Sequence, residues 1–352
     1  KYLLSVERQQ KVKEALYLFL LQKREENELS QAFTAYNTRI VTPPHGSMLP
    51  TSPVHKNIFM VAFALGLLIP IVIIFMRENM NTRVRGRKDL ENLTIPFIGE
   101  IPLFTRKKKG ILGKKPQEVK AVIVKEGNRD IINEAFRVLR TNLEFMTGKD
   151  KTSNVIIMTS FNPGSGKSFL TMNIAVSLAI KGKKVLVIDG DLRHASASSY
   201  IDSPDKGLSD YLGGRIDNLD EIIVPDPKHK SMDILPVGTI PPNPTELLFD
   251  ERLKQTIDTV REQYDYVLID CPPVELVADT QIIEKLADRT IFVVRAGLLE
   301  RSMLSELEKI YDEKKYKNMS LILNGTEGSG GRYGYRYGYR YGYHYGYGSG
   351  YH

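Results

Sequence analysis

A glycine-rich turn that ends in Gly-Lys-Ser carries the clearest chemistry in this sequence of 352 residues. An apolar run precedes the turn and a helical pattern follows it. Backbone N–H groups in such a turn surround phosphate oxygens, and the start of a helix favours an anion. We expect Lys167 to reach the β- and γ-phosphates of a nucleotide and the Ser168 hydroxyl to bind Mg²⁺. The expected nucleotide contacts from the turn are Pro163, Gly164, Ser165, Gly166, Lys167, Ser168 and Phe169.

Three aspartates follow two other apolar runs. Asp189 and Asp191 come just after the run KVLVI, and Asp270 ends the run YVLID. In an open parallel sheet, ligands gather at the carboxyl ends of the strands. Acids placed there beside a phosphate loop suit Mg²⁺ binding and acceptance of a proton from an attacking hydroxyl. A lone aspartate would fit a helix N-cap better, but the joint placement favours an active site.

Short apolar runs alternate with helical patterns between residues 116 and 327. This alternation predicts an α/β fold with a mainly parallel sheet and helices on both faces. About 200 residues are enough for one such domain. Strands are predicted at residues 120–124, 154–158, 184–188, 233–236, 266–269, 290–294 and 320–323.

The residues before this domain fall into four segments. Residues 1–41 are predicted to be the end of a helical region, and residues 42–57 a proline-rich connector. Residues 58–76 carry no charge, and nineteen helical residues span about 28 Å, which favours a transmembrane helix over a buried core helix. Residues 77–115 form a basic juxtamembrane linker, within which residues 95–103 are expected to be an extended stretch docked on the domain.

The net charge of +7 is concentrated in the basic linker. Residues 77–115 hold eleven Lys or Arg against four acids, and the local excess of 11 − 4 = 7 equals the whole net charge. The positive-inside rule then places the C-terminal side in the cytoplasm and residues 1–55 outside. The linker also suits contact with anionic lipid headgroups. Nucleic-acid binding is not expected, because the neighbouring span already explains the charge.

Cysteine and histidine usage excludes two further classes of site. The single cysteine excludes a disulfide framework and a cysteine-based metal site within one chain, and the six histidines show no metal-ligand spacing. The sequence begins at Lys1 in what looks like the middle of a helix. We therefore expect it to belong to a longer protein.

Residues 328–352 form a low-complexity tail of glycine, arginine and tyrosine. Nine of the eighteen tyrosines lie in the last twenty residues, and the tail has no aliphatic residue, so we expect a flexible segment. The composition is compatible with β-prone aggregation, nucleic-acid contact, a passive linker, a cloning artefact or a set of phosphorylation sites. The candidate phosphoacceptors are Tyr333, Tyr335, Tyr337, Tyr339, Tyr341, Tyr343, Tyr345, Tyr347 and Tyr351.

Four features together resemble the bacterial tyrosine kinases of the capsule and exopolysaccharide co-polymerase (chain-length determinant) family. They are DGDLR at 189–193, EAFRVLRTNL at 134–143, PPNPTELL at 241–248 and the terminal tyrosine cluster. The whole chain resembles the last periplasmic helix, the second membrane span and the cytoplasmic P-loop kinase domain of such a protein. The resemblance implies ATP and Mg²⁺ as cofactors and autophosphorylation of the tail tyrosines.

The resemblance also implies roles for single residues. Lys167 would bind phosphate, and Ser168, Asp191 and Asp270 would hold the Mg²⁺. Asp189 would be the base that accepts the tyrosine proton, and Arg193 would help to hold the acidic loop. Asn324 resembles the adenine contact of the family, although a turn residue after the last strand is an equal alternative.

The resemblance further implies partners and a location. Glu134, Arg137 and Arg140 would join neighbouring kinase domains in a homo-oligomeric ring, such as an octamer. The alternative for these three residues is a solvated helix face with ordinary ion pairs. Other implied partners are membrane lipid, a polysaccharide polymerase and export machinery, and a tyrosine phosphatase, all at a bacterial inner membrane. Residues 85–88 lie where the family activates a neighbouring kinase, but membrane topology alone would explain their charge.

Two alternatives from other classes stay open. A nucleotide-switched assembly ATPase of the partition or cell-division type would use water as the attacking group. Such proteins often carry an additional lysine early in the loop, where this sequence has Ser160, Phe161, Asn162 and Pro163, without the usual first glycine either. A non-catalytic membrane scaffold fits less well, because the lysine and all three aspartates are present.

Overall fold

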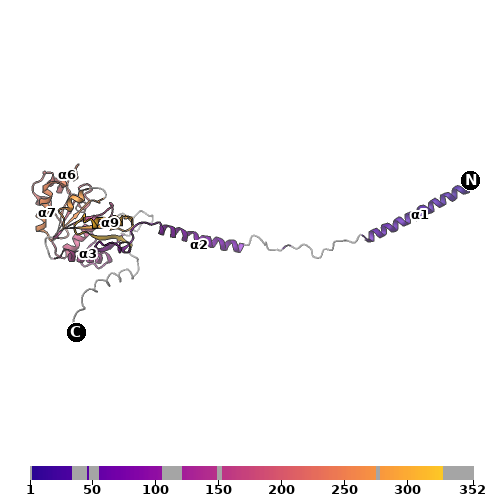
Figure 1. Cartoon of the computed structure of the whole chain (residues 1–352), viewed down its shortest axis with the longest axis horizontal. Coiled ribbons are helices and arrows are strands. Elements are labelled where there is room, and N and C mark those ends of the chain that lie inside the picture. Colours follow the sequence, from indigo (N-terminus) through magenta and orange to yellow (C-terminus); the bar gives the residue numbers. More distant parts are fainter. Residues whose placement is uncertain are drawn as a thin grey trace, which may run out of the picture. The chain divides into compact units, whose positions relative to one another are not determined.

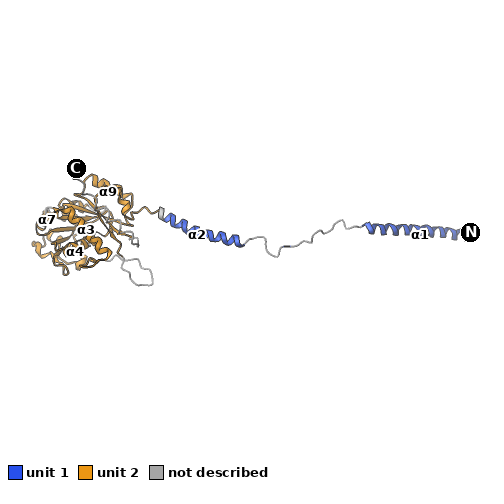
Figure 2. Cartoon of the chain, turned by 90° about the horizontal axis from the view of Figure 1, so that it is seen from below, with its two compact units in different colours: residues 1–77 blue, residues 78–352 orange. Residues whose placement is uncertain are grey.

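The computed structural model describes residues 2–33, 46, 55–104, 121–148, 153–274 and 278–327, and the chain divides into two compact units (Figures 1 and 2). The first unit, residues 1–77, contains α1 (Tyr2–Phe33) and most of α2 (His55–Asn79). Within α2, His55–Arg77 is long and apolar enough to cross a membrane, and its most apolar window is 0% buried. The helix therefore covers the predicted span of 58–76 and extends it at both ends.

The second unit, residues 78–352, is built on an eight-stranded sheet. The strand order is β1-β8-β7-β2-β6-β3-β5-β4, and every pairing is parallel except that of β4 with β5. This confirms the predicted α/β fold. The strands are β1 (Phe97–Pro102), β2 (Val155–Thr159), β3 (Val185–Asp189), β4 (Val224–Pro225), β5 (Met232–Leu235), β6 (Tyr266–Asp270), β7 (Arg289–Arg295) and β8 (Ser320–Thr326).

Helices cover both faces of the sheet, as predicted. Along β2, Ile157 and Met158 point to opposite faces and belong to two separate buried clusters. The cluster around Met158 includes side chains of α3 (Ile131–Thr147) and α4 (Lys167–Ile180). The cluster around Ile157 includes residues of the remaining helices, which are α5 (Leu208–Leu212), α6 (Pro244–Leu248), α7 (Glu251–Gln263), α8 (Asp279–Glu284) and α9 (Met303–Asp312).

The predicted strand at 120–124 is wrong, since residues 121–124 form no strand. The side chain of Asn173 on α4 supplies the reason. Its Oδ1 accepts hydrogen bonds from the backbone N–H groups of Ile123 (2.8 Å) and Val124 (3.1 Å). A side-chain amide thus satisfies donors that a neighbouring strand would otherwise have to meet.

The edge strand β1 instead comes from the stretch that we expected to be a linker. β1 pairs in parallel with β8, with Phe97 opposite Leu321 and Ile101 opposite Asn324. Val84 and Ile101 are fully buried at 0% exposure. The folded unit therefore begins well before residue 116, where the sequence had placed its boundary.

Residues 82–84, which follow α2, also pack within the second unit. Val84 donates its N–H to the carbonyl of Leu299 (2.8 Å), and its carbonyl accepts from Gly297 (2.7 Å). The Arg301 N–H donates to the carbonyl of Thr82 at 2.8 Å. These bonds attach the chain just after α2 to the loop that follows β7.

Candidate active site

The phosphate loop connects β2 to α4, as the sequence predicted. Gly164 and Gly166 have φ angles of 73° and 86°, in the left-handed region that glycine adopts without strain. The hydroxyls of Ser160 and Ser165 each donate a 2.8 Å bond to the carbonyl of Asn162. The turn is thus closed by its own side chains and opens directly into the N-terminus of α4.

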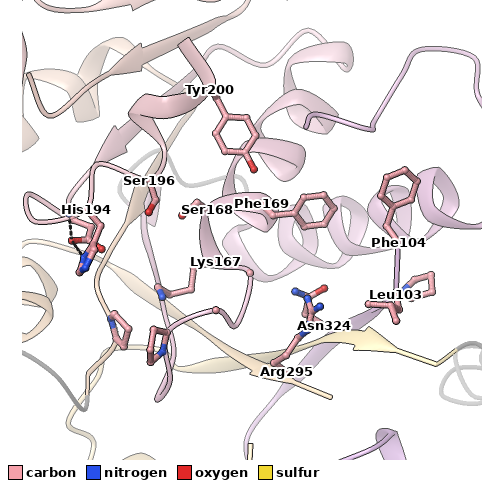
Figure 3. A pocket seen from close by; sticks show the side chains of 16 residues that line it. Leu103, Phe104, Lys167, Ser168, Phe169, His194, Ser196, Tyr200, Arg295 and Asn324 are labelled. Atoms are coloured by element: carbon pink, nitrogen blue, oxygen red, sulfur yellow. Dashed lines mark hydrogen bonds and ion pairs between the residues drawn. The ribbon is translucent and has the colours of Figure 1, made fainter. Parts of the chain in front are cut away.

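A cavity of about 430 Å³ lies against this loop (Figure 3). Its volume is in the range of small-molecule sites. The predicted loop residues Pro163, Gly164, Gly166, Lys167, Ser168 and Phe169 all line it. Ser165 does not line it, and its carbonyl instead accepts a bond from Asn324.

Lys167 is buried at the base of the loop. The residue is 8% exposed, and Nζ lies 3.4 Å from the Ser160 hydroxyl. Burial lowers the pKa of this ammonium group, while Asp270 and Asp191 act in the opposite direction. A phosphate group near Lys167 would add negative charge and favour the protonated form.

Asp270 ends β6, the strand next to β2, and its carboxyl lies close to the side chain of Ser168 at the start of α4 without lining the cavity. Burial and the nearby Asp189 raise the pKa of Asp270 to about 8. Its Oδ1 is buried and has no hydrogen-bond partner among the described residues. A bound cation would satisfy this oxygen, so the residues present fit a Mg²⁺ ion.

The described part of the chain has no cluster of three or more His, Cys, Asp or Glu side chains arranged to hold a metal alone. Mg²⁺ is usually held by one or two carboxylates together with substrate phosphates. Ser168, Asp191 and Asp270 therefore suit a magnesium ion that arrives with a nucleotide.

Asp189 and Asp191 have different environments. Asp191 lines the cavity, and its Oδ1 accepts bonds from the N–H groups of Arg193 and His194, each 3.2 Å long. Asp189 is fully buried and does not line the cavity. Its Oδ2 accepts from the N–H (2.7 Å) and the hydroxyl (2.6 Å) of Ser198, and burial raises its pKa to about 6.

Arg193 does not line the cavity. Its guanidinium contacts Asp279 at 3.1 Å and Thr245 at 2.9 Å. Arg193 is therefore placed to hold the acidic loop and not to touch a nucleotide in that cavity.

Asn324 lies within β8 and lines the cavity, so its alternative assignment as a turn residue is wrong. Its Nδ2 donates to the Ser165 carbonyl at 2.8 Å. A Cβ on Gly166 would lie 2.3 Å from that nitrogen, which explains the need for glycine there. Asn324 thus holds the phosphate loop from β8, which is separated from β2 by β7.

Half of the residues that line the cavity were not predicted from the sequence. Arg295 could have been found, because it is a charged residue at the end of the apolar strand TIFVVR, where ligands gather. The others have no such signal: Pro102 ends β1, Tyr200 lies in the short 3-10 helix Ser198–Ile201, and the rest come from loops. The missed lining residues are Pro102, Leu103, Phe104, His194, Ser196, Tyr200, Pro273 and Arg295.

Two family models match the chain. Residues 153–322 match a model described as an AAA domain, and residues 1–79 match one described as a G-rich domain on putative tyrosine kinase. Among solved structures, the kinase domain of Escherichia coli tyrosine kinase Etk is 28% identical, with a TM-score of 0.61 over 76% of this chain and 100% of that chain. The BceF tyrosine kinase domain is 30% identical, with a TM-score of 0.58 over 69% of this chain and 99% of that one. The chain belongs to the bacterial tyrosine kinases.

Curated relatives of this bacterial tyrosine kinase are longer proteins. The putative tyrosine-protein kinase AmsA of Erwinia amylovora is 32% identical over 336 residues, which cover 91% of this chain and 45% of the relative. The tyrosine-protein kinase Wzc of Salmonella typhimurium is 32% identical over 322 residues, covering 88% of this chain and 43% of the relative. The chain thus spans a little under half the length of these relatives.

The three predicted interface residues of this kinase lie on α3, away from the nucleotide cavity. Arg137 pairs with Glu134 and also bonds to the carbonyl of Asn128. Arg140 donates a 2.8 Å bond to the carbonyl of Ser177 on α4. The charged groups that would join neighbouring kinase domains therefore also make contacts within the chain.

The nine candidate phosphoacceptors, from Tyr333 to Tyr351, lie outside the described residues.

Proposed function

We propose that this chain is the catalytic part of a membrane-bound protein-tyrosine autokinase, which transfers the γ-phosphate of ATP to tyrosines of its C-terminal tail. The observation that carries the proposal is the meeting of Lys167, Ser168, Asp191 and Asp270 at one phosphate loop, in a chain that ends in nine closely spaced tyrosines. The phosphorylation would regulate the polymerisation and export of a capsular polysaccharide or exopolysaccharide.

The loop residues bind and orient the phosphates. The backbone turn and Lys167 neutralise charge on the transferring group, and the start of α4 favours the anion. Ser168, Asp191 and Asp270 would hold Mg²⁺, which supplies additional charge neutralisation in phosphoryl transfer. Asn324 holds the loop in place through its bond to the Ser165 carbonyl. Because it also lines the cavity, it could contact the adenine base.

A carboxylate must accept the proton of the attacking tyrosine, whose hydroxyl has an ordinary pKa near 10. The family resemblance assigns this role to Asp189. In the present geometry, however, Asp189 is buried against Ser198, whereas Asp191 lines the cavity. We therefore propose that Asp191, and not Asp189, is the carboxylate placed to accept the tyrosine proton. Asp189 would instead hold the segment that begins at Ser198.

We further propose an inner-membrane location with residues 1–55 in the periplasm and the kinase unit in the cytoplasm. The span within α2 and the basic excess that follows it support this orientation. Glu134, Arg137 and Arg140 would contribute to a ring, such as an octamer, in which one kinase modifies the tail of its neighbour. A polysaccharide polymerase and export machinery, membrane lipid and a tyrosine phosphatase complete the proposed partners.

A complementation experiment tests transfer between subunits. The Lys167→Met chain, with its tail intact, is mixed in detergent with an active chain that ends at residue 327, and γ-labelled ATP and Mg²⁺ are added. Label on the Lys167→Met chain is expected, because the active subunit has no tail tyrosine of its own. If the unmodified chain labels itself but never labels Lys167→Met, transfer within one subunit replaces the ring mechanism.

A further inference from the structure

Three side chains outside the nucleotide cavity form a closed network beside the turn that carries Asp191. Arg193 Nε lies 3.1 Å from Oδ2 of Asp279, and Arg193 Nη2 donates a 2.9 Å bond to Oγ1 of Thr245. The Thr245 hydroxyl donates to the other carboxylate oxygen, Oδ1 of Asp279, at 2.6 Å. The network joins the turn after β3, the helix α6 and the start of α8.

Burial of the Asp279 carboxylate restricts how the three side chains can be arranged. Asp279 is 1% exposed, and a carboxylate removed from water is tolerated only when its oxygens are paired. Arg193 and Thr245 bond to one oxygen each. Moving either partner would leave a buried oxygen uncompensated, so the three segments are held at fixed positions.

The turn that Arg193 anchors also sets the direction of the Asp191 carboxylate. Asp191 Oδ1 accepts from the N–H groups of Arg193 and His194, both at 3.2 Å. Ala195 closes the turn with a φ of 48°, a conformation that a residue with a side chain adopts only when its surroundings impose it. A turn of this kind needs external support, and the Arg193 side chain supplies it from α6 and α8.

We propose that Thr245 and Asp279 are positioning residues, which act through Arg193 to hold the Asp191 carboxylate at the nucleotide cavity. The inference rests on the proposed function, in which Asp191 helps to hold a magnesium ion. It also gives a role to the segment PPNPTELL, which contains Thr245 and had served only as a mark of resemblance. Partners that orient a metal-binding carboxylate typically change metal affinity by about 10–100-fold when they are lost.

The test compares Asp279→Asn and Thr245→Val with the control Asp288→Asn. Asp288 makes a similar pair with Arg261 at 2.6 Å, but it precedes β7 at the amino-terminal ends of the strands, whereas the cavity lies at their carboxyl ends. Fluorescent mant-ADP bound to the full chain in detergent is titrated with MgCl₂, and its affinity in EDTA is measured separately. Both network variants should raise the half-saturating Mg²⁺ concentration by about 10-fold or more with unchanged affinity in EDTA, and the control should change neither.

The outcomes separate this proposal from the proposed function. If the unmodified chain binds mant-ADP with Mg²⁺ and the network variants titrate like Asp288→Asn, the positioning role is wrong and the nucleotide site stands. If the unmodified chain binds no nucleotide, the proposed function itself fails. Should Asp279→Asn lose its circular dichroism signal, Thr245→Val decides, because it removes a single hydroxyl. A normal Mg²⁺ curve for Thr245→Val overturns the proposal.

Discussion

Asp270 is buried and, among the described residues, incompletely hydrogen-bonded, which suits a residue that binds a cation. The same properties make its ionised form destabilise the folded chain when no cation is bound. The residue is 1% exposed, and one of its oxygens has no hydrogen-bond partner within the described structure. Burial and Asp189 raise the pKa of Asp270 to about 8, and burial raises that of Asp189 to about 6. At the residue scale, the site is therefore arranged for a positive charge, which Lys167 supplies in part.

The pH dependence of stability should report on Asp270. Its carboxyl binds its proton more tightly in the folded chain than in the unfolded chain, where the pKa is near 3.8. Between about pH 4 and pH 8 the folded state therefore holds more protons, and the free energy of unfolding falls as pH rises. We expect the nucleotide-free chain to lose more stability between pH 5 and pH 8 than Asp270→Asn does. Urea unfolding in detergent at both pH values measures the difference, and equal losses would contradict the assigned environment.

At the element scale, what could be predicted depended on whether a feature was contiguous in the sequence. The phosphate loop and the acids at or just beyond the ends of β3 and β6 were identified because each follows an apolar run directly. β1 was missed because FIGEIP contains a glycine and a proline and follows another proline. Its place in the sheet also depends on pairing with β8, which is distant in the sequence. Tyr200 and Phe104 were missed because only the folded chain brings them to the same cavity as Lys167.

The contact between residues 82–84 and the loop after β7 is another element that the sequence could not show. This loop begins next to Arg295, which lines the nucleotide cavity, and the N–H of Ala296 bonds to the carbonyl of Asn324 at 2.9 Å. Only a few residues separate the end of α2 from Val84. The segment after the proposed span is thus attached to the strand ends that clamp the phosphate loop.

Val84→Ala tests the contribution of this contact. Val84 is 0% exposed, and removing two buried carbon atoms should cost about 2 kcal/mol of unfolding free energy. The matched control is Val138→Ala on α3, because Val138 is 39% exposed. Thermal unfolding in detergent should show a lower Tm for Val84→Ala only. We also expect weaker mant-ADP binding by Val84→Ala, and unchanged affinity would show that the contact is structural alone.

At the scale of the whole molecule, the chain joins a helix suited to cross a membrane, a nucleotide-binding unit and a tyrosine-rich tail. A switch ATPase would use the first two parts but leaves the nine tail tyrosines without a role. An autokinase uses all three, since phosphorylation adds about −1.5 to −2 charges per tyrosine and would reverse the charge of an arginine-bearing tail. The tail is therefore where the two functions differ.

Mapping phosphate on the tail tests the central claim most directly. The chain is treated with phosphatase, purified and incubated with Mg²⁺ and ATP beside the Lys167→Met variant, and peptides are analysed by mass spectrometry. We predict phosphotyrosine within residues 333–351 of the unmodified chain and none in Lys167→Met. Release of free phosphate from ATP by the unmodified chain with every tail tyrosine unmodified would contradict the kinase assignment and favour the switch ATPase.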